Sequence, residues 1–201
     1  GSSESMSKSK KNVVDPEKII KEYGADTARW FMLSDSPPER DINWSSSGIK
    51  GAWKFTQKFW RVVNDCKDIF NVDLISRPKI FDDFTNEFRK QVHKHLKSIT
   101  DSINTFQMNV AVAKIHELTA LISNFAPNNF EGKWSKKEAL IILLRVTEPM
   151  MPHIVEECWY LIGNKNSIIE TEWPKHDESL ILDNEVKIII QINGKKKGEL
   201  N

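Results

Sequence analysis

Helix-period stripes of hydrophobic residues constrain the fold of this chain more than any other feature. Between residues 47 and 70, mainly apolar side chains recur every three or four positions and so share one helical face: Ile49, Ala52, Trp53, Thr56, Phe59, Trp60, Val63 and Cys66. Similar stripes run through residues 82–106, 109–125 and 135–149, and a shorter one covers 153–162. Amphipathic helices bury their apolar faces against one another, so the pattern predicts a mostly α protein built on an antiparallel helical bundle.

The same stripes indicate which residues form the core. In the second predicted helix the inward residues are Phe84, Phe88, Val92, Leu96, Ile99, Ile103 and Phe106. In the third they are Val112, Ile115, Leu118, Thr119 and Ile122. The fourth helix is predicted to begin at Ser135, because Glu138 three residues later completes a capping box.

A short α segment is predicted before the bundle and a β hairpin after it. Asp15 with Pro16 is typical of a helix start, and Gly24 of a helix end. A second short helix follows, with Asp26 as its predicted cap. After residue 172 the alternation around Ile188 and the Asn-Gly pair at 193–194 predict a strand and a hairpin turn. Because one hairpin is not stable alone in water, we expect it to be the start of a truncated domain.

Composition narrows the class of protein. Hydrophobic residues make up 39% of the chain and charged residues 28%, which favours a folded core over disorder. The net charge is +1, so nucleic-acid binding would depend on local clusters of cations. Cys66 and Cys158 cannot form a disulfide framework, and no apolar run approaches the roughly 18 residues that span a bilayer. We therefore expect a reduced, cytoplasmic protein with no secretory signal, membrane partner or metal site.

Two basic segments are candidate binding elements. Residues 5–12, Ser-Met-Ser-Lys-Ser-Lys-Lys-Asn, predict a mobile loop whose ammonium and hydroxyl groups could close over a polyphosphate, with a solvated basic tail as the alternative. Lys50, Lys54, Lys58 and Arg61 lie opposite the apolar face of the first long helix. That face would either contact a phosphate backbone or remain solvated.

Other polar and aromatic residues have structural interpretations. His153 beside Pro152 is expected to be a helix-start or packing residue. His93 and His95 are two positions apart on a helix, so they diverge and cannot share a metal ion. Three tryptophans are expected in the bundle core: Trp53, Trp60 and Trp159.

The first basic segment and the residues after it resemble a known family. Met6-Ser7-Lys8-Ser9, followed by Val-Val-Asp-Pro at 13–16 and Tyr-Gly-Ala-Asp-Thr at 23–27, is similar to the KMSKS loop and the next segment of class I aminoacyl-tRNA synthetases. The family's loop usually begins with Lys, and Ser5 stands at that place here.

Further residues narrow the resemblance to the leucyl-tRNA synthetase family. Ser-Pro-Pro-Glu-Arg-Asp at 36–41, with Trp44 after it, is similar to that branch and unlike the isoleucine and valine enzymes. Residues 152–159 resemble a signature of the family's helical bundle, and residues 190–195 resemble the opening hairpin of its C-terminal domain.

The resemblance implies a role for each segment. The parent enzyme would activate leucine with ATP, as its magnesium complex, and transfer it to tRNA(Leu). Lys8 would be the catalytic lysine, and Met6, Ser7, Lys8 and Ser9 would form the ATP loop. Lys50, Lys54, Lys58 and Arg61 become candidates for tRNA contact. We expect both the parent and this fragment to be monomeric, with no cofactor bound to the fragment.

The resemblance also implies a division of the chain and a limit on its activity. Residues 1–46 would be the KMSKS loop and stem-contact segment, 47–170 the tRNA-binding bundle, and 171–201 a linker and the start of the last domain. The family's nucleotide-binding α/β core, with its His-x-Gly-His signature, has no counterpart here, so the fragment alone is expected to be inactive. The alternatives are a free-standing RNA-binding module, a fragment of an isoleucine, valine or methionine enzyme, and a helical adaptor.

Overall fold

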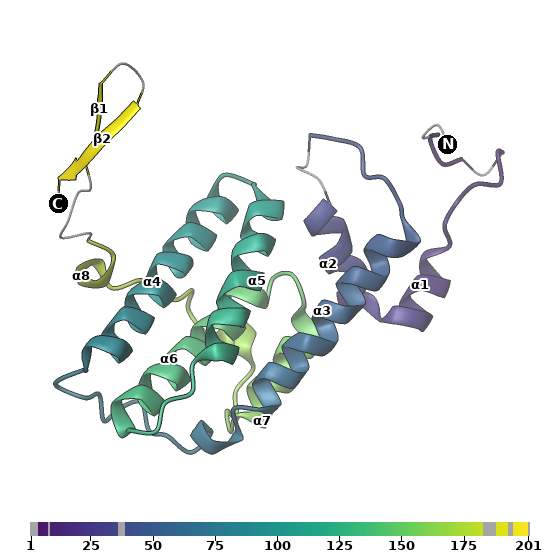
Figure 1. Ribbon diagram of the computed structural model, residues 1–201. Coiled ribbons are helices and arrows are strands. Elements are labelled where there is room, and N and C mark those ends of the chain that lie inside the picture. The colour runs from purple at the N-terminus through teal and green to yellow at the C-terminus, as the bar shows by residue number, and fades with distance from the viewer. Residues whose placement is uncertain (1–3, 8, 36–38, 183–187, 193–194, 201) are drawn as a thin grey trace.

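The computed structural model describes residues 4–7, 9–35, 39–182, 188–192 and 195–200, and it is helical throughout its core (Figure 1). The longer helices are α1 (Pro16–Tyr23), α2 (Ala25–Asp35), α3 (Ser46–Asn64), α4 (Asp83–Asn104), α5 (Met108–Asn124), α6 (Phe130–Thr147) and α7 (Pro152–Leu161). Short elements follow α3 and α7: η1 (Lys67–Ile69), η2 (Ile168–Glu170) and α8 (Glu178–Ile181). Along the described residues, none of the helices is both long and apolar enough to cross a bilayer.

The predicted bundle is confirmed, and its core lies where α4, α5 and α6 pack together (Figure 1). The largest fully buried side chains there come from the predicted stripes and from α6: Leu96, Ile99, Ile115, Leu118, Ile122, Leu140, Leu143 and Leu144. The ends of the second stripe were predicted wrongly, because Phe84 is 66% exposed and Phe106 is 68% exposed. Phe84 lies in the first turn of α4, and Phe106 follows the end of that helix with a φ of +57°.

The start of α6 differs from the sequence prediction. The helix begins at Phe130, where the side chain of Asn129 accepts the amide of Gly132 at 3.0 Å. Ser135 therefore lies inside the helix, and its hydroxyl donates to the carbonyl of Glu131. Asn129 is itself an effective cap, so the Ser135–Glu138 pattern is not needed as one.

The N-terminal helices pack directly on the bundle. Asp15 caps α1 as predicted, and Gly24 ends that helix with a φ of +84°. Helix α2 contacts α3, α5 and α7, and the ring of Trp30 stacks on Phe55 with centroids 4.6 Å apart. Gly48 of α3 lets the Phe31 ring of α2 approach closely, since a Cβ at this position would lie 2.5 Å from that ring. The N-terminal segment is thus held beside the first turns of α3.

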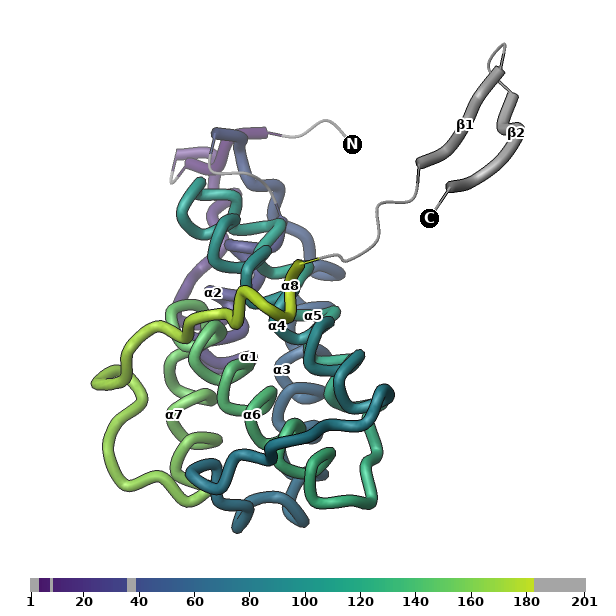
Figure 2. Tube along the Cα trace, turned by 90° about the vertical axis from the view of Figure 1, so that its left-hand side faces the viewer, coloured from purple at the N-terminus to yellow at the C-terminus, as the bar shows by residue number. Residues whose placement is uncertain are grey.

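After α7 the chain returns across the bundle and reaches α4 (Figure 2). Strands β1 (Ile188–Ile192) and β2 (Lys195–Leu200) pair antiparallel, with a register shift between Ile190 and Gln191. Val186, the first residue of the predicted alternating strand, and the Asn-Gly turn at 193–194 lie outside the described residues. That the strand pair opens a truncated domain stays a prediction.

Candidate nucleic-acid interface

The basic loop at the N-terminus is closed by hydrogen bonds within itself. The side chain of Asn12 accepts the amide of Ser7 at 2.8 Å and donates to the carbonyl of Ser5 at 3.1 Å. The hydroxyl of Ser7 accepts the amide of Lys10 at 3.2 Å and lies 3.1 Å from the hydroxyl of Ser9. Asn12 therefore sets the shape of this loop, a role that the sequence did not single out. The predicted mobility of the loop stays a prediction.

The predicted catalytic residue Lys8 lies outside the described residues, so its role rests on the resemblance. Of the other lysines in the loop, Lys10 lies 3.8 Å from the carboxylate of Glu4, and both side chains are largely exposed. Such a pair is weak in water, so the Lys10 ammonium can exchange this partner for a phosphate. Ser7 and Ser9 present hydroxyls on the same turn.

An apolar groove of about 410 Å³ lies under this loop. Its walls come from the loop, α1, α2 and the segment before α3: Met6, Val14, Pro16, Ile19, Ile20, Ala28, Met32, Ile42 and Trp44. Met6, Ile20 and Met32 are each nearly half exposed. Met6, predicted as part of the ATP loop, thus joins the loop to this apolar surface.

The four candidate tRNA-binding residues form one exposed face of α3. Lys50, Lys54, Lys58 and Arg61 are all exposed and recur at helical spacing, and α3 carries no acidic residue. The first and the last lie eleven positions apart along the helix, a span of about 16 Å. Within the described residues, no carboxylate lies within ion-pair distance of any of them. The opposite face is fixed by the buried rings of Phe55 and Phe59.

Aromatic side chains border this basic face. An open groove of about 550 Å³ lies along the seam between α3 and α7, lined by Trp53, Thr56, Gln57, Trp60, Arg61, Asn64 and Ile154. Trp60 is 38% exposed, so its prediction as a core residue was wrong, whereas Trp159 is buried as predicted. Trp53 is partly buried and meets the ring of Tyr23 edge-on at 6.4 Å. The seam therefore offers indole surface beside the cations.

A histidine that the sequence did not single out lies next to the basic face. His116 on α5 lies against Phe55, with ring centroids 3.8 Å apart, and against Trp30 at 5.6 Å. Desolvation lowers the pKa of His116, and the positive charge of Lys58 lowers it further. The charge of Lys58 thus acts on His116 of α5, so the pKa of His116 should rise when a bound anion neutralises that lysine.

Asp26 connects the N-terminal segment to α7. Its carboxylate accepts the amide of Ile154 at 2.7 Å and lies 2.8 Å from Nδ1 of His153. The prediction that Asp26 caps its own helix was wrong: it caps the N-terminus of α7, more than 120 residues away. His153 lies at a helix start as predicted. The contact holds one wall of the seam beside α3.

The paired histidines on α4 do not converge. His95 lies 3.2 Å from the carboxylate of Glu117, whereas His93 is buried and accepts a backbone amide from Asp177. No group of three metal-ligating side chains occurs among the residues that the structure describes.

Two family models match parts of this chain. Residues 85–201 match the family described as the anticodon-binding domain of tRNA ligase, and residues 2–45 match tRNA synthetases class I (I, L, M and V). The leucine–tRNA ligases of Parvibaculum lavamentivorans and Bradyrhizobium diazoefficiens are 46% and 42% identical to this chain over its whole length. The chain spans 23% of each of these relatives.

A solved structure has the same fold. In the ternary complex of the Agrobacterium radiobacter K84 agnB2 LeuRS with tRNA and LeuAMS, the protein superposes with a TM-score of 0.81 at 26% identity. The match covers 97% of this chain and 25% of that one. The chain therefore belongs to the anticodon-binding domain family of tRNA ligases, and its homologues are the C-terminal regions of leucine–tRNA ligases.

Proposed function

We propose that this chain is the tRNA-binding part of a leucine–tRNA ligase and that α3 contacts the phosphate backbone of tRNA(Leu). The exposed face of Lys50, Lys54, Lys58 and Arg61 carries the proposal, because it presents four positive charges along about 16 Å with no acidic residue on the same helix. Contacts of this type position an RNA and do not read its sequence. The rim of Trp53 and Trp60 adds apolar surface for riboses or an unstacked base.

The parent reaction proceeds in two steps. Leucine and ATP first form leucyl-adenylate and pyrophosphate, and the leucyl group then passes to the terminal ribose of tRNA(Leu) with release of AMP. The loop that includes Met6, Ser7, Lys8 and Ser9 serves the first step by closing over the phosphates of ATP. Lys8 supplies a positive charge where negative charge builds up in the transition state.

The remainder of the class I catalytic region packs, in this proposal, on the apolar groove between the loop, α1 and α2. The half-exposed side chains of Met6, Ile20 and Met32 support this assignment, as does the match of residues 2–45 to class I synthetases. The 201-residue chain by itself should therefore give no leucine-dependent exchange of pyrophosphate into ATP. Exchange above background by the purified chain would contradict this part of the proposal.

We further propose that the parent is a monomeric cytoplasmic enzyme. Cys66 and Cys158 are both buried and unpaired, which suits a reducing compartment. Burial raises the pKa of the Cys158 thiol to about 12, so this thiol stays protonated at neutral pH. Sedimentation of the full-length enzyme with and without tRNA(Leu) tests the monomeric state.

Binding of a tRNA(Leu) transcript to the 201-residue chain tests the RNA-binding face. The test variant changes Lys50, Lys54, Lys58 and Arg61 to Gln. The matched control changes four exposed lysines outside α3 to Gln, which lowers the net charge by the same amount: Lys67, Lys79, Lys165 and Lys175. At fixed salt, the α3 variant should bind far more weakly than the control. Equal loss in both variants would show that binding follows net charge and not this face.

A further inference from the structure

The return segment, residues 171–182, is fastened to the outside of α4. The indole of Trp173 donates to the hydroxyl of Thr100 at 3.0 Å, and Leu180 of α8 is buried. Between these two points, the backbone amide of Asp177 donates to Nδ1 of His93 at 3.0 Å. The segment thus meets α4 at successive positions.

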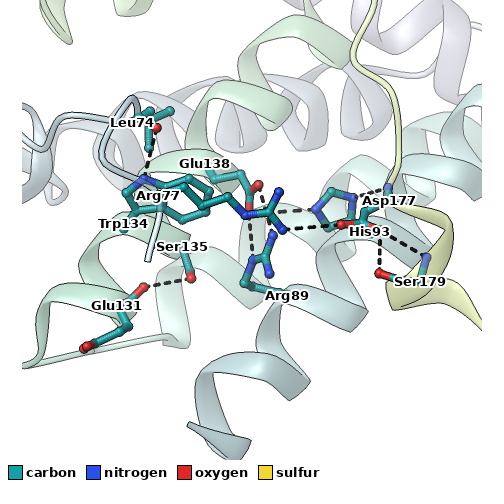
Figure 3. A network of polar contacts seen from close by, with 10 residues as sticks. All are labelled: Leu74, Arg77, Arg89, His93, Glu131, Trp134, Ser135, Glu138, Asp177 and Ser179. Atoms are coloured by element: carbon teal, nitrogen blue, oxygen red, sulfur yellow. Dashed lines mark hydrogen bonds and ion pairs between the residues drawn. The ribbon is translucent and has the colours of Figure 1, made fainter. Parts of the chain in front are cut away.

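The contact at Asp177 requires a particular form of His93. A ring nitrogen that accepts an amide hydrogen bond carries no proton, so the proton of the neutral imidazole is on Nε2. That nitrogen is buried, has no hydrogen-bond partner among the described residues and lies 3.8 Å from a carboxylate oxygen of Glu138 (Figure 3). A protonated ring would carry a second N–H on Nδ1, pointing at the N–H of Asp177.

Two carboxylates and two guanidinium groups lie near this ring (Figure 3). Glu138 of α6 is held by Arg89 of α4, whose Nε and Nη2 donate to its carboxylate at 3.0 and 3.3 Å. Asp177 of the return segment lies 3.5 Å from Nη2 of Arg77. A charged ring therefore has a partner in Glu138 but loses its hydrogen bond to the return segment.

We propose that His93 is a pH-dependent latch for the return segment. Neutral His93 accepts the amide of Asp177 and holds the segment against α4. Protonated His93 turns its charge toward Glu138, cannot accept that amide, and releases the segment around Asp177. One other imidazole belongs to the described part of the segment: His176, which lies 2.9 Å from the carboxylate of Glu178.

Hydrogen exchange at the Asp177 amide tests the latch. In the 201-residue chain, protection corrected for the intrinsic exchange rate should fall roughly fivefold or more between pH 8 and pH 5, the effect of losing one hydrogen bond. His93→Asn keeps an acceptor near the position of Nδ1 and does not titrate, so protection should persist at both pH values. His93→Leu has no acceptor, so protection should be low at both.

Control variants separate the latch from other titrations. His95→Asn and His176→Asn should retain the wild-type fall in protection, and core amides such as that of Leu96 should stay protected throughout. Unchanged protection of Asp177 in the wild-type chain between pH 8 and pH 5 would overturn the proposal. So would a fall that survives in His93→Asn or disappears in His176→Asn. If His93→Leu does not fold, the wild-type and His93→Asn profiles still decide the question.

Discussion

Replacing Asp26 by Ala should destabilise the protein through α7, although Asp26 lies in α2. The Asp26 side chain is 8% exposed, and it accepts the Ile154 amide at 2.7 Å in the first turn of α7. The substitution leaves that amide without an acceptor and removes a negative charge from a helix N-terminus. The contacts to His153 and Arg29 add little, because both of these side chains are about half exposed or more.

The expected cost is about 2–4 kcal/mol of the free energy of unfolding. A hydrogen bond to a charged group contributes about 1.5–3 kcal/mol, and a charge at a helix N-terminus about 0.3–1 kcal/mol. Asp26→Asn keeps an acceptor for the Ile154 amide and loses only the charge, so it should cost about 1 kcal/mol. His153→Ala should change stability by less than about 0.5 kcal/mol.

Urea unfolding followed by tryptophan fluorescence measures these differences. Hydrogen exchange should show faster opening of the first turn of α7 in Asp26→Ala, with α4 and α5 less affected. If Asp26→Ala lies within 0.5 kcal/mol of the wild type, or costs no more than Asp26→Asn, then Asp26 does not cap α7 and the reasoning is refuted.

Three further predictions concern charge. Burial opposes ionisation of Glu138, but its basic partners outweigh burial and hold the pKa of its carboxyl below the ordinary 4.5. The ionised carboxylate therefore stabilises the folded protein above about pH 4.5, and this contribution is lost as the pH falls through the lower folded pKa. Glu138→Gln should accordingly flatten the acid limb of the free energy of unfolding measured with urea. NMR titration should show a higher pKa for His116 in Lys58→Gln than in the wild type, because one of the two causes of its lowered pKa is removed. An unchanged pKa of His116 would contradict the placement of the Lys58 charge beside α5. In the full-length enzyme, Lys8→Ala should slow leucyl-adenylate formation roughly 100- to 1,000-fold with little change in leucine binding, as measured in single-turnover experiments; a larger loss in Lys10→Ala would show that the loop register is wrong.

The bundle could be predicted from the sequence because its signal is local. Helical periodicity depends only on neighbours three and four positions apart, so Leu96, Ile115 and Ile122 were placed in the core correctly. The same rule failed at the two ends of the second stripe, because Phe84 lies in the first turn of α4 and Phe106 follows the end of that helix with a φ of +57°. Periodicity identifies a face of a helix, but it does not fix where the helix ends or how much of each end is buried.

The candidate site was predictable only in part, for the same reason. The basic face of α3 is a local pattern, and the structure leaves its four residues exposed. The partner of Asp26 is more than 120 residues away, and that of His93 is 84 residues away, so no local pattern could reveal either contact. Trp60 was misplaced because it lines the open groove between α3 and α7 and not the closed core.

The salt dependence of tRNA(Leu) binding tests the central claim most directly. Each phosphate contact that releases a counterion contributes roughly 0.7–0.9 to the slope of log K against log salt. Changing Lys50, Lys54, Lys58 and Arg61 to Gln should therefore reduce the magnitude of that slope by roughly three, whereas the control with Lys67, Lys79, Lys165 and Lys175 changed to Gln should keep nearly the wild-type slope. Equal slopes for the wild type and the α3 variant would contradict the assignment of this face to the tRNA backbone.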